Sequence, residues 1–222
     1  MLSEMITGRM SFTQIVLYIL SALIVIFLTL PFHEFAHAFI ADKLGDKTAR
    51  FGGRLTVNPF AHIDYFGALA IILFGFGWAR PVPVNARYFK NPKAGMALTA
   101  LAGPVMNILL ASVACFIMYA VAAITKSSSV GIYIVLFLSY YVQINVGLAV
   151  FNLIPIPPLD GWKVLSAFLP SRIYFKVLGY ERYISFALIL IVYLDILDAP
   201  IGMLSNILIN IITFLPRVIF GY

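Results

Sequence analysis

The chain has 222 residues, of which 62% are hydrophobic and only 11% are charged. A soluble globular domain is about half apolar and about one quarter charged, so this composition indicates a polytopic membrane protein. The net charge of +6 does not indicate a nucleic-acid partner, because the Lys and Arg residues stand in short loops beside apolar segments, where they set topology and meet anionic headgroups. The single cysteine, Cys115, excludes an intrachain disulfide and a multi-cysteine metal site.

The first apolar segment, residues 13–40, predicts a membrane-spanning helix. At about 1.5 Å per residue it is long enough to cross a hydrocarbon core of about 30 Å with some tilt. No A-x-A-like cleavage site follows it, so we interpret it as a retained helix rather than a signal peptide. The span ends in the polar cluster "PFHEFAHAF", residues 31–39.

The next apolar run, "GALAIILFGFGW" at residues 67–78, is too short for a span and is typical of a re-entrant segment. It is flanked by "RLTVNP" and "ARPVPVN". Pro81 and Pro83 disfavour helix and suit extended chain at a sheet edge. We therefore predict a short re-entrant β-like hairpin between the first two spans.

Three further apolar regions complete the chain. Residues 96–124 and 130–154 predict one span each, and residues 183–216 predict two shorter spans that are broken at 195–200, or one long kinked helix. The fold class is then a polytopic α-helical membrane protein with about four to five transmembrane helices. We expect one membrane-embedded domain over residues 1–222, with a catalytic core at about 13–165 and C-terminal helices at about 183–216.

The distribution of basic residues predicts the orientation, since cytoplasmic loops are enriched in Lys and Arg. If residues 55–90 dip into the membrane and return, Arg9 and Lys126 lie outside. The cytoplasmic loops then hold Lys43, Lys47, Arg50, Arg54, Arg87, Lys90, Lys93, Lys163, Arg172, Lys176 and Arg182. This asymmetry places both "HEFAH" and "PPLDG" at the cytoplasmic ends of their helices.

The segment "HEFAH" carries the pattern H-E-x-x-H. Residues four apart lie on one face of a helix, so His33 and His37 can present two imidazole nitrogens to one ion, with Glu34 beside them. This pattern is typical of zinc metalloproteases, in which the histidines bind zinc and the glutamate acts as the general base. The alternative is a set of polar residues hydrogen-bonded across a helix bundle. Ionisable residues within a span are costly, which favours the functional interpretation.

A catalytic zinc needs a third protein ligand. His62, Asp64, Asp160, Asp195 and Asp198 are candidates, and Asp160 is the best of them. It follows "IPIPP", which cannot continue as helix, and non-helical backbone at membrane depth is tolerated only where protein or a water cavity buries it. Asp195 and Asp198 have the character of loop residues on the far side.

Together, "HEFAH", "NPFAHID", "GFGWARPVPVN", "LAGPVMN" and "NLIPIPPLDG" resemble the site-2 protease family of intramembrane zinc metalloproteases. The resemblance covers roughly residues 30–165 and is strongest to the compact prokaryotic branch without a PDZ domain. It implies one zinc ion held by His33, His37 and Asp160, with Glu34 activating water. It also implies cleavage of single-span membrane proteins in a prokaryotic cell membrane, at a site near the cytoplasmic side. The region after about residue 165 matches no motif.

Several other residues are candidates for the site. Asn152 could bind the oxyanion or the substrate backbone, or it could cap the broken helix. Asn107 and His62 are candidates for residues that support the metal ligands; His62 could also be a spare ligand or an interfacial side chain. A substrate helix must unwind before it is cut, and its exposed backbone groups then need partners. We expect residues 50–57, with Arg54, Leu55, Thr56 and Val57, to supply them as a strand with a free edge.

The function predicted from the sequence is therefore intramembrane zinc-dependent endopeptidase activity on membrane protein substrates. The main alternative is a membrane metal-ion transporter that uses the His/Asp site for transit, although such proteins usually show paired broken helices and only one break is evident here. A catalytically silent scaffold would have no need for Glu34. The expected partners are single-span membrane proteins and the lipid bilayer, and the sequence does not fix the oligomeric state.

Overall fold

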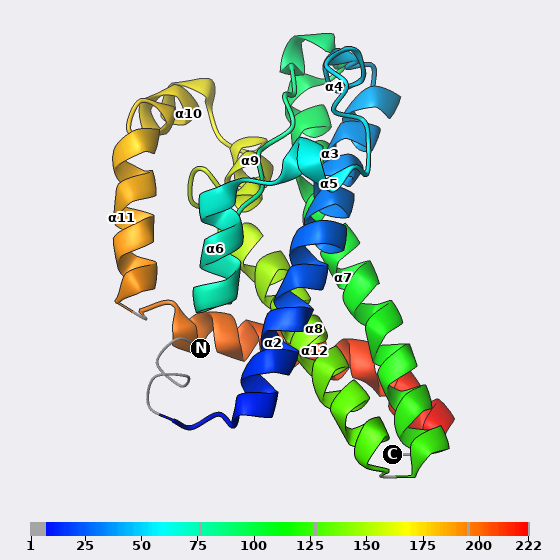
Figure 1. Cartoon of the computed structure of the whole chain (residues 1–222). Coiled ribbons are helices and arrows are strands. Elements are labelled where there is room, and N and C mark those ends of the chain that lie inside the picture. The colour runs from blue at the N-terminus through cyan, green and yellow to red at the C-terminus, as the bar shows by residue number, and fades with distance from the viewer. Residues whose placement is uncertain (1–7, 76, 127, 195, 222) are drawn as a thin grey trace.

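The structure is a computed structural model that describes residues 8–75, 77–126, 128–194 and 196–221. These residues form helices and connecting loops, and no β-strand occurs among them. Within the described part of the chain, four helices are long and apolar enough to cross a membrane, which confirms the predicted α-helical membrane architecture. Three of the four lie side by side, and the fourth crosses them obliquely (Figure 1).

The first span is one continuous helical segment of 32 residues, Phe12–Lys43. It consists of α2 (Phe12–Ile24), a π-helical turn η1 (Val25–Thr29) and α3 (Leu30–Lys43). Ser11 begins it with a capping box, because its hydroxyl accepts from the Gln14 N–H while the Gln14 side chain accepts from the Ser11 N–H. The polar cluster of the sequence lies in α3, beyond the π turn.

The second and third spans are α7 (Pro92–Thr125) and α8 (Ser129–Asn152), which pack against each other and against the first span. Small residues line the buried face of α7. They include Gly95, Ala100, Gly103, Ala111 and Ala114. Small side chains allow helix backbones to approach closely in a membrane, and here they allow α3 to lie directly on α7.

The predicted β-like hairpin between the first two spans is wrong. Short helices α4 (Thr48–Phe51) and α5 (Pro59–His62) lead into α6 (Tyr65–Phe74), which packs on α2. The chain then returns as extended residues 77–85, and the Arg80 N–H donates to the His62 carbonyl at 2.7 Å. Gly67 lies so close to Trp78 that a Cβ atom added to Gly67 would stand 1.9 Å from the carbonyl oxygen of Trp78. The hairpin is thus one helix paired with one extended arm.

After α8, the described residues contain four helices of unequal length, α9 to α12. The first two, α9 (Asp160–Ser166) and α10 (Ser171–Leu178), are short. Earlier in the chain, a short 3₁₀ turn, η2 (Ala86–Tyr88), precedes α7. The predicted break in the last apolar region is confirmed, because α11 (Glu181–Tyr193) ends before α12 (Asp198–Phe220) begins. With 13 residues, α11 is about 20 Å long and too short for a full span, whereas α12 is long enough.

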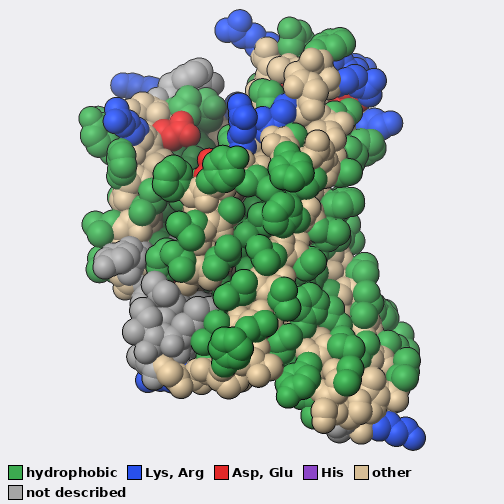
Figure 2. Space-filling model, viewed as in Figure 1, with side chains coloured by type: hydrophobic (Ala, Val, Ile, Leu, Met, Phe, Trp, Pro, Cys, Tyr) green, Lys and Arg blue, Asp and Glu red, His purple; other side chains and the backbone are tan. Residues whose placement is uncertain are grey.

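The surface agrees with a membrane environment. Hydrophobic side chains cover the middle of the face shown in Figure 2, whereas Lys and Arg gather at the end of the molecule where α4 lies. Many large apolar side chains on α7 and α12 are exposed, among them Val113, Phe214 and Val218. In water so large an apolar surface would be costly, but lipid covers it without penalty.

Candidate active site

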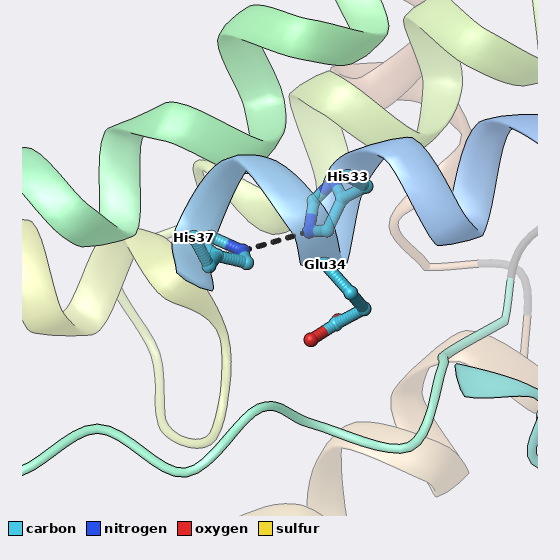
Figure 3. A group of neighbouring side chains, drawn as sticks. All are labelled: His33, Glu34 and His37. Atoms are coloured by element: carbon cyan, nitrogen blue, oxygen red, sulfur yellow. Dashed lines mark hydrogen bonds between the residues drawn. The ribbon is translucent and has the colours of Figure 1, made fainter. Parts of the chain in front are cut away.

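His33 and His37 lie one turn apart on α3 and face α7. Both are buried, and their Nε2 atoms are 3.0 Å apart (Figure 3). The Nδ1 atom of His37 is 2.7 Å from the Thr99 carbonyl oxygen, and since a carbonyl only accepts, this nitrogen carries the proton. The Nδ1 atom of His33 contacts Oδ1 of Asn107 at 3.2 Å in the same way. Both Nε2 atoms are therefore left with free lone pairs that point at each other.

Asp160 joins this cluster from a segment that is far away in the sequence. The helix α8 ends at Asn152, and the following turns bring the first residue of α9 back to α3. Oδ2 of Asp160 lies 3.4 Å from Nε2 of His33 and 3.1 Å from Nε2 of His37, whereas Oδ1 accepts from Lys163 Nζ at 3.0 Å. Burial alone would raise the pKa of Asp160, but the neighbouring imidazoles and Lys163 hold this pKa well below its ordinary value.

These atoms fit a zinc ion. Two imidazole nitrogens and one carboxylate oxygen converge within 3.4 Å of one another. Buried polar groups need partners, and a cation placed among these three atoms would supply one to all of them. Two histidines and a carboxylate are the ligand set of several catalytic zinc sites, and the Nδ1 contacts with Asn107 and Thr99 orient the rings as metal-ligating histidines require. Ligand atoms of His33, Glu34 and His37 also lie within 4.8 Å of one another.

The side chain of Glu34 extends from α3 towards the extended arm of the hairpin (Figure 3). Its Oε2 accepts a hydrogen bond from the Val82 N–H at 2.9 Å. Between this arm, α3 and the start of α9 lies a cavity of about 380 Å³. Its lining includes His33, Glu34, His37, Asp160 and Asn152. A peptide in this cavity would therefore touch the metal-binding cluster and the glutamate at once.

The other residues predicted for the site fall into two groups. Asn152 lines the cavity, and its Nδ2 donates to the Leu148 carbonyl of its own helix at 2.9 Å. Asn107 is fully buried against His33, as expected for a residue that supports a ligand. Asp64, in contrast, is not in the cluster, since its Oδ1 caps α6 by accepting from the Gly67 N–H. Asp198 stands at the start of α12, and Asp195 lies outside the described residues.

His62 is buried away from the catalytic cavity. Its Nε2 lies 2.8 Å from the Thr56 carbonyl oxygen, so this nitrogen donates and the ring fastens the loop before α5. Burial lowers the pKa of His62 below its ordinary value, although this hydrogen bond acts in the opposite direction. The ring therefore serves as an anchor for the loop and does not join His33 and His37.

The predicted substrate-pairing strand over residues 50–57 is also wrong. Arg50 and Phe51 belong to α4, and Gly53 turns the chain with a positive φ of 65°. Arg54, Leu55, Thr56 and Val57 follow as irregular loop and do not line the cavity. Arg54 instead donates from Nη2 to the Arg80 and Pro81 carbonyls, which fixes the extended arm from outside. The arm that lines the cavity comes from residues 77–85, through Pro81, Val82 and Val84.

Four residues of the site were missed in the sequence. Thr99 and Val82 act through backbone atoms, which carry no sequence signal. Lys163 pairs with Asp160 three residues earlier, a spacing at which helical side chains meet. Gly103 could have been found from "LAGPVMN": a Cβ at this position would lie 2.4 Å from Nε2 of His37 and 2.5 Å from Nε2 of His33. It is a glycine because the two rings fill the space in front of it.

Comparison with known proteins supports the same assignment. The chain matches peptidase family M50 over residues 21–124 and 117–192. It is 41% identical over 189 residues to a Bacillus subtilis protein named as a zinc metalloprotease, YwhC, which covers 83% of this chain and 82% of the relative. A zinc metalloprotease by name from Methanocaldococcus jannaschii, MJ0611, is 31% identical over 162 residues, covering 70% and 75% of the two chains.

A third relative, Rip2 of Mycobacterium tuberculosis, also carries the name of a zinc metalloprotease and is 30% identical over 148 residues, covering 64% of this chain and 54% of the relative. No solved structure matches the chain. The family match does not favour the metal transporter. The family match and the relatives show that the chain belongs to peptidase family M50, the site-2 protease family, and is a zinc metalloprotease.

Proposed function

We propose that this zinc metalloprotease hydrolyses peptide bonds in or near the transmembrane segments of membrane proteins. One observation carries the proposal: His33, Glu34 and His37 lie inside the first of the helices that can cross a membrane, and all three are buried. The cavity beside them is bounded by the same helix. A substrate that reaches this cavity from within the bilayer need not leave the membrane to be cut.

The residues of the cavity divide the chemistry among them. His33, His37 and Asp160 would hold zinc, which when bound lowers the pKa of a water molecule and polarises the substrate carbonyl. Glu34 accepts a proton from that water at its carboxylate and then passes it to the leaving amine. The Val82 N–H keeps the Glu34 carboxylate turned into the cavity. Asn152 also lines the cavity, and we expect its side chain to contact the backbone of the bound peptide.

The substrate must be unwound where it is cut. An intact transmembrane helix uses its own carbonyls in hydrogen bonds, and opening it leaves polar groups that cost several kcal/mol unless they find partners. Substrates with Gly or Pro near the scissile bond should therefore be cut faster than all-Leu versions. The basic residues at the end of the molecule near α4 favour a cytoplasmic position for this end, and thus cleavage near the cytoplasmic side of a prokaryotic cell membrane.

The test uses the purified protein in lipid with single-span substrates. Glu34→Gln keeps the size of the side chain but removes the base, so zinc should remain bound at one ion per chain while cleavage falls by about a hundredfold or more. A chelator should abolish cleavage by the wild-type protein, and added zinc should restore it. If Glu34→Gln cuts the substrate as fast as the wild-type protein does, the assigned role of Glu34 is wrong. If only soluble peptides are cut, the proposal that the substrates are membrane proteins is wrong.

A further inference from the structure

A second cavity, which we call the α11 pocket, lies beside the catalytic cavity and shares part of its wall. It has a volume of about 250 Å³. Trp78, Asn152 and Leu159 line both cavities, as do Gly77 and Pro158. A peptide lying in the catalytic cavity would therefore have the α11 pocket directly at its side, next to the residues that flank the bond to be cut.

The far wall of the α11 pocket is apolar. Leu188, Ile189 and Val192 come from α11, and Phe151 comes from the end of α8. Ser185 is polar, but its hydroxyl already donates to the Glu181 carbonyl of its own helix at 2.8 Å. Among the described residues that line the pocket, none is charged. An apolar cavity of about 150 Å³ is enough to hold benzene, so this one has room for a large apolar side chain.

We propose that the α11 pocket receives an apolar side chain of the substrate, from one of the two residues that flank the scissile bond, and so selects which bond is cut. The inference rests on the proposed function. It assigns a specificity role to α11, the short helix of the C-terminal region for which the sequence offers no motif. A charged side chain would lose its water in this pocket and find no partner, so it is rejected.

The experiment compares four single-span substrates that differ only at the residues flanking the cleavage site, which carry Ala, Leu, Phe or Asp. Wild-type protein should cut the Leu and Phe substrates about tenfold or more faster than the Ala substrate, the range that a filled apolar pocket gives. The Asp substrate should be slower still. Equal cleavage rates for all four substrates would overturn the proposed role of the α11 pocket in substrate selection.

Variants of α11 then test the walls. Leu188→Ala enlarges the pocket and should shift the preference from Leu towards Phe, whereas Val192→Phe fills it and should shift the preference towards Ala. The readout is the ratio of kcat/KM between two substrates for one variant, which does not depend on the fraction of folded protein. Leu190→Ala is the matched control, because Leu190 is 56% exposed on the same helix and does not line the pocket. Ratios that change in Leu190→Ala as much as in Leu188→Ala would contradict the proposal.

Failure of the proposed function looks different. If the wild-type protein cuts none of the four substrates, the proposal that it acts on membrane proteins is wrong. The role of the α11 pocket is then tested by measuring binding. Zinc-loaded Glu34→Gln protein is titrated with two peptide hydroxamates that differ only in one side chain, Leu or Asp, while the fluorescence of Trp78 is followed in a Trp162→Phe background. Tighter binding of the Leu compound that Val192→Phe abolishes supports the pocket, and equal affinities overturn it.

Discussion

The backbone N–H of Val82 donates to the carboxylate of Glu34 at 2.9 Å, across 48 residues of sequence. Val82 stands between Pro81 and Pro83, and neither proline has an N–H. The only donor of this three-residue run is thus aimed at the glutamate of the H-E-x-x-H motif. The extended arm is itself held on both sides, by the Arg80 N–H on the His62 carbonyl and by the Asn85 N–H on Asp46 at 2.6 Å.

The first prediction removes this donor. Val82→Pro keeps an extended chain but eliminates the N–H, so Glu34 should lose its orientation and cleavage should fall about tenfold or more, with zinc still bound. Val84→Pro is the control, since the Val84 N–H makes no hydrogen bond within the described residues; its loss should be much smaller. In a Glu34→Gln background, Val82→Pro should cause no further loss. An additional loss there would show that Val82 acts independently of Glu34.

The second prediction concerns Gly103. Within a helix, Gly→Ala normally stabilises by up to about 1 kcal/mol. At Gly103 the new methyl would overlap the imidazoles of His33 and His37, so Gly103→Ala should reduce zinc content measured by elemental analysis. The comparison is Gly147→Ala on α8, where nothing lies within 4 Å of the added carbon. That variant should keep full zinc content. A Gly103→Ala protein with one tightly held zinc ion would contradict the assigned geometry.

The third prediction identifies the remaining ligand. Asp160→Ala removes the carboxylate oxygen nearest both Nε2 atoms and should lower the zinc stoichiometry of the detergent-purified protein. His62→Ala should leave it nearly unchanged, because this ring contacts Thr56 in a separate loop. If His62→Ala lowered the zinc stoichiometry and Asp160→Ala did not, His62 rather than Asp160 would be the third ligand.

The fourth prediction is a pH dependence of stability that comes from His62. Its pKa in the folded protein is lowered by burial from the ordinary value of 6.5, so near pH 6 the unfolded chain binds more protons than the folded one. The stabilisation by neutral His62 is therefore complete above pH 6.5 and declines as the pH falls below it. Thermal unfolding of the wild-type protein should show a larger decrease in Tm between pH 7.5 and 5.5 than His62→Asn does. Parallel decreases would remove His62 as the cause.

The part of the site that the sequence predicts is the part that depends on local spacing. His33 and His37 share a helix face because they are four residues apart, and any helix over residues 31–39 places them together. Asp160 could be chosen because the proline-rich break that precedes it ends a span on the same side as α3. Local sequence thus indicates both the pair and the candidate ligand, whereas the contact between Asp160 and the two histidines depends on tertiary packing.

The β-like hairpin failed for reasons that only tertiary structure shows. Extended backbone over residues 79–85 was predicted, but Pro81 and Pro83 have no N–H to donate to a ladder. Three other N–H groups of this segment donate to His62, Glu34 and Asp46 instead. On the other side, Gly52 and Gly53 end α4 and turn the chain away before a strand can form. The β-propensity of a segment indicates that its backbone can be extended, but it does not indicate which groups will form hydrogen bonds with that backbone.

The π-helical turn η1 (Val25–Thr29) has a consequence for how the first span is assembled. Such a turn amounts to one extra residue in an α-helix and rotates everything beyond it by about 100°. Tyr18 in α2 faces the hairpin, where its hydroxyl donates to the Ile71 carbonyl, whereas His33 in α3 faces Asn107 on α7. The π-helical turn thus allows α2 and α3 to present different faces to their neighbours, because it changes the rotation of α3 about the helix axis relative to α2. Deleting one residue within it would restore a regular helix and swing both imidazoles out of line with Asp160, although no ligand had been altered.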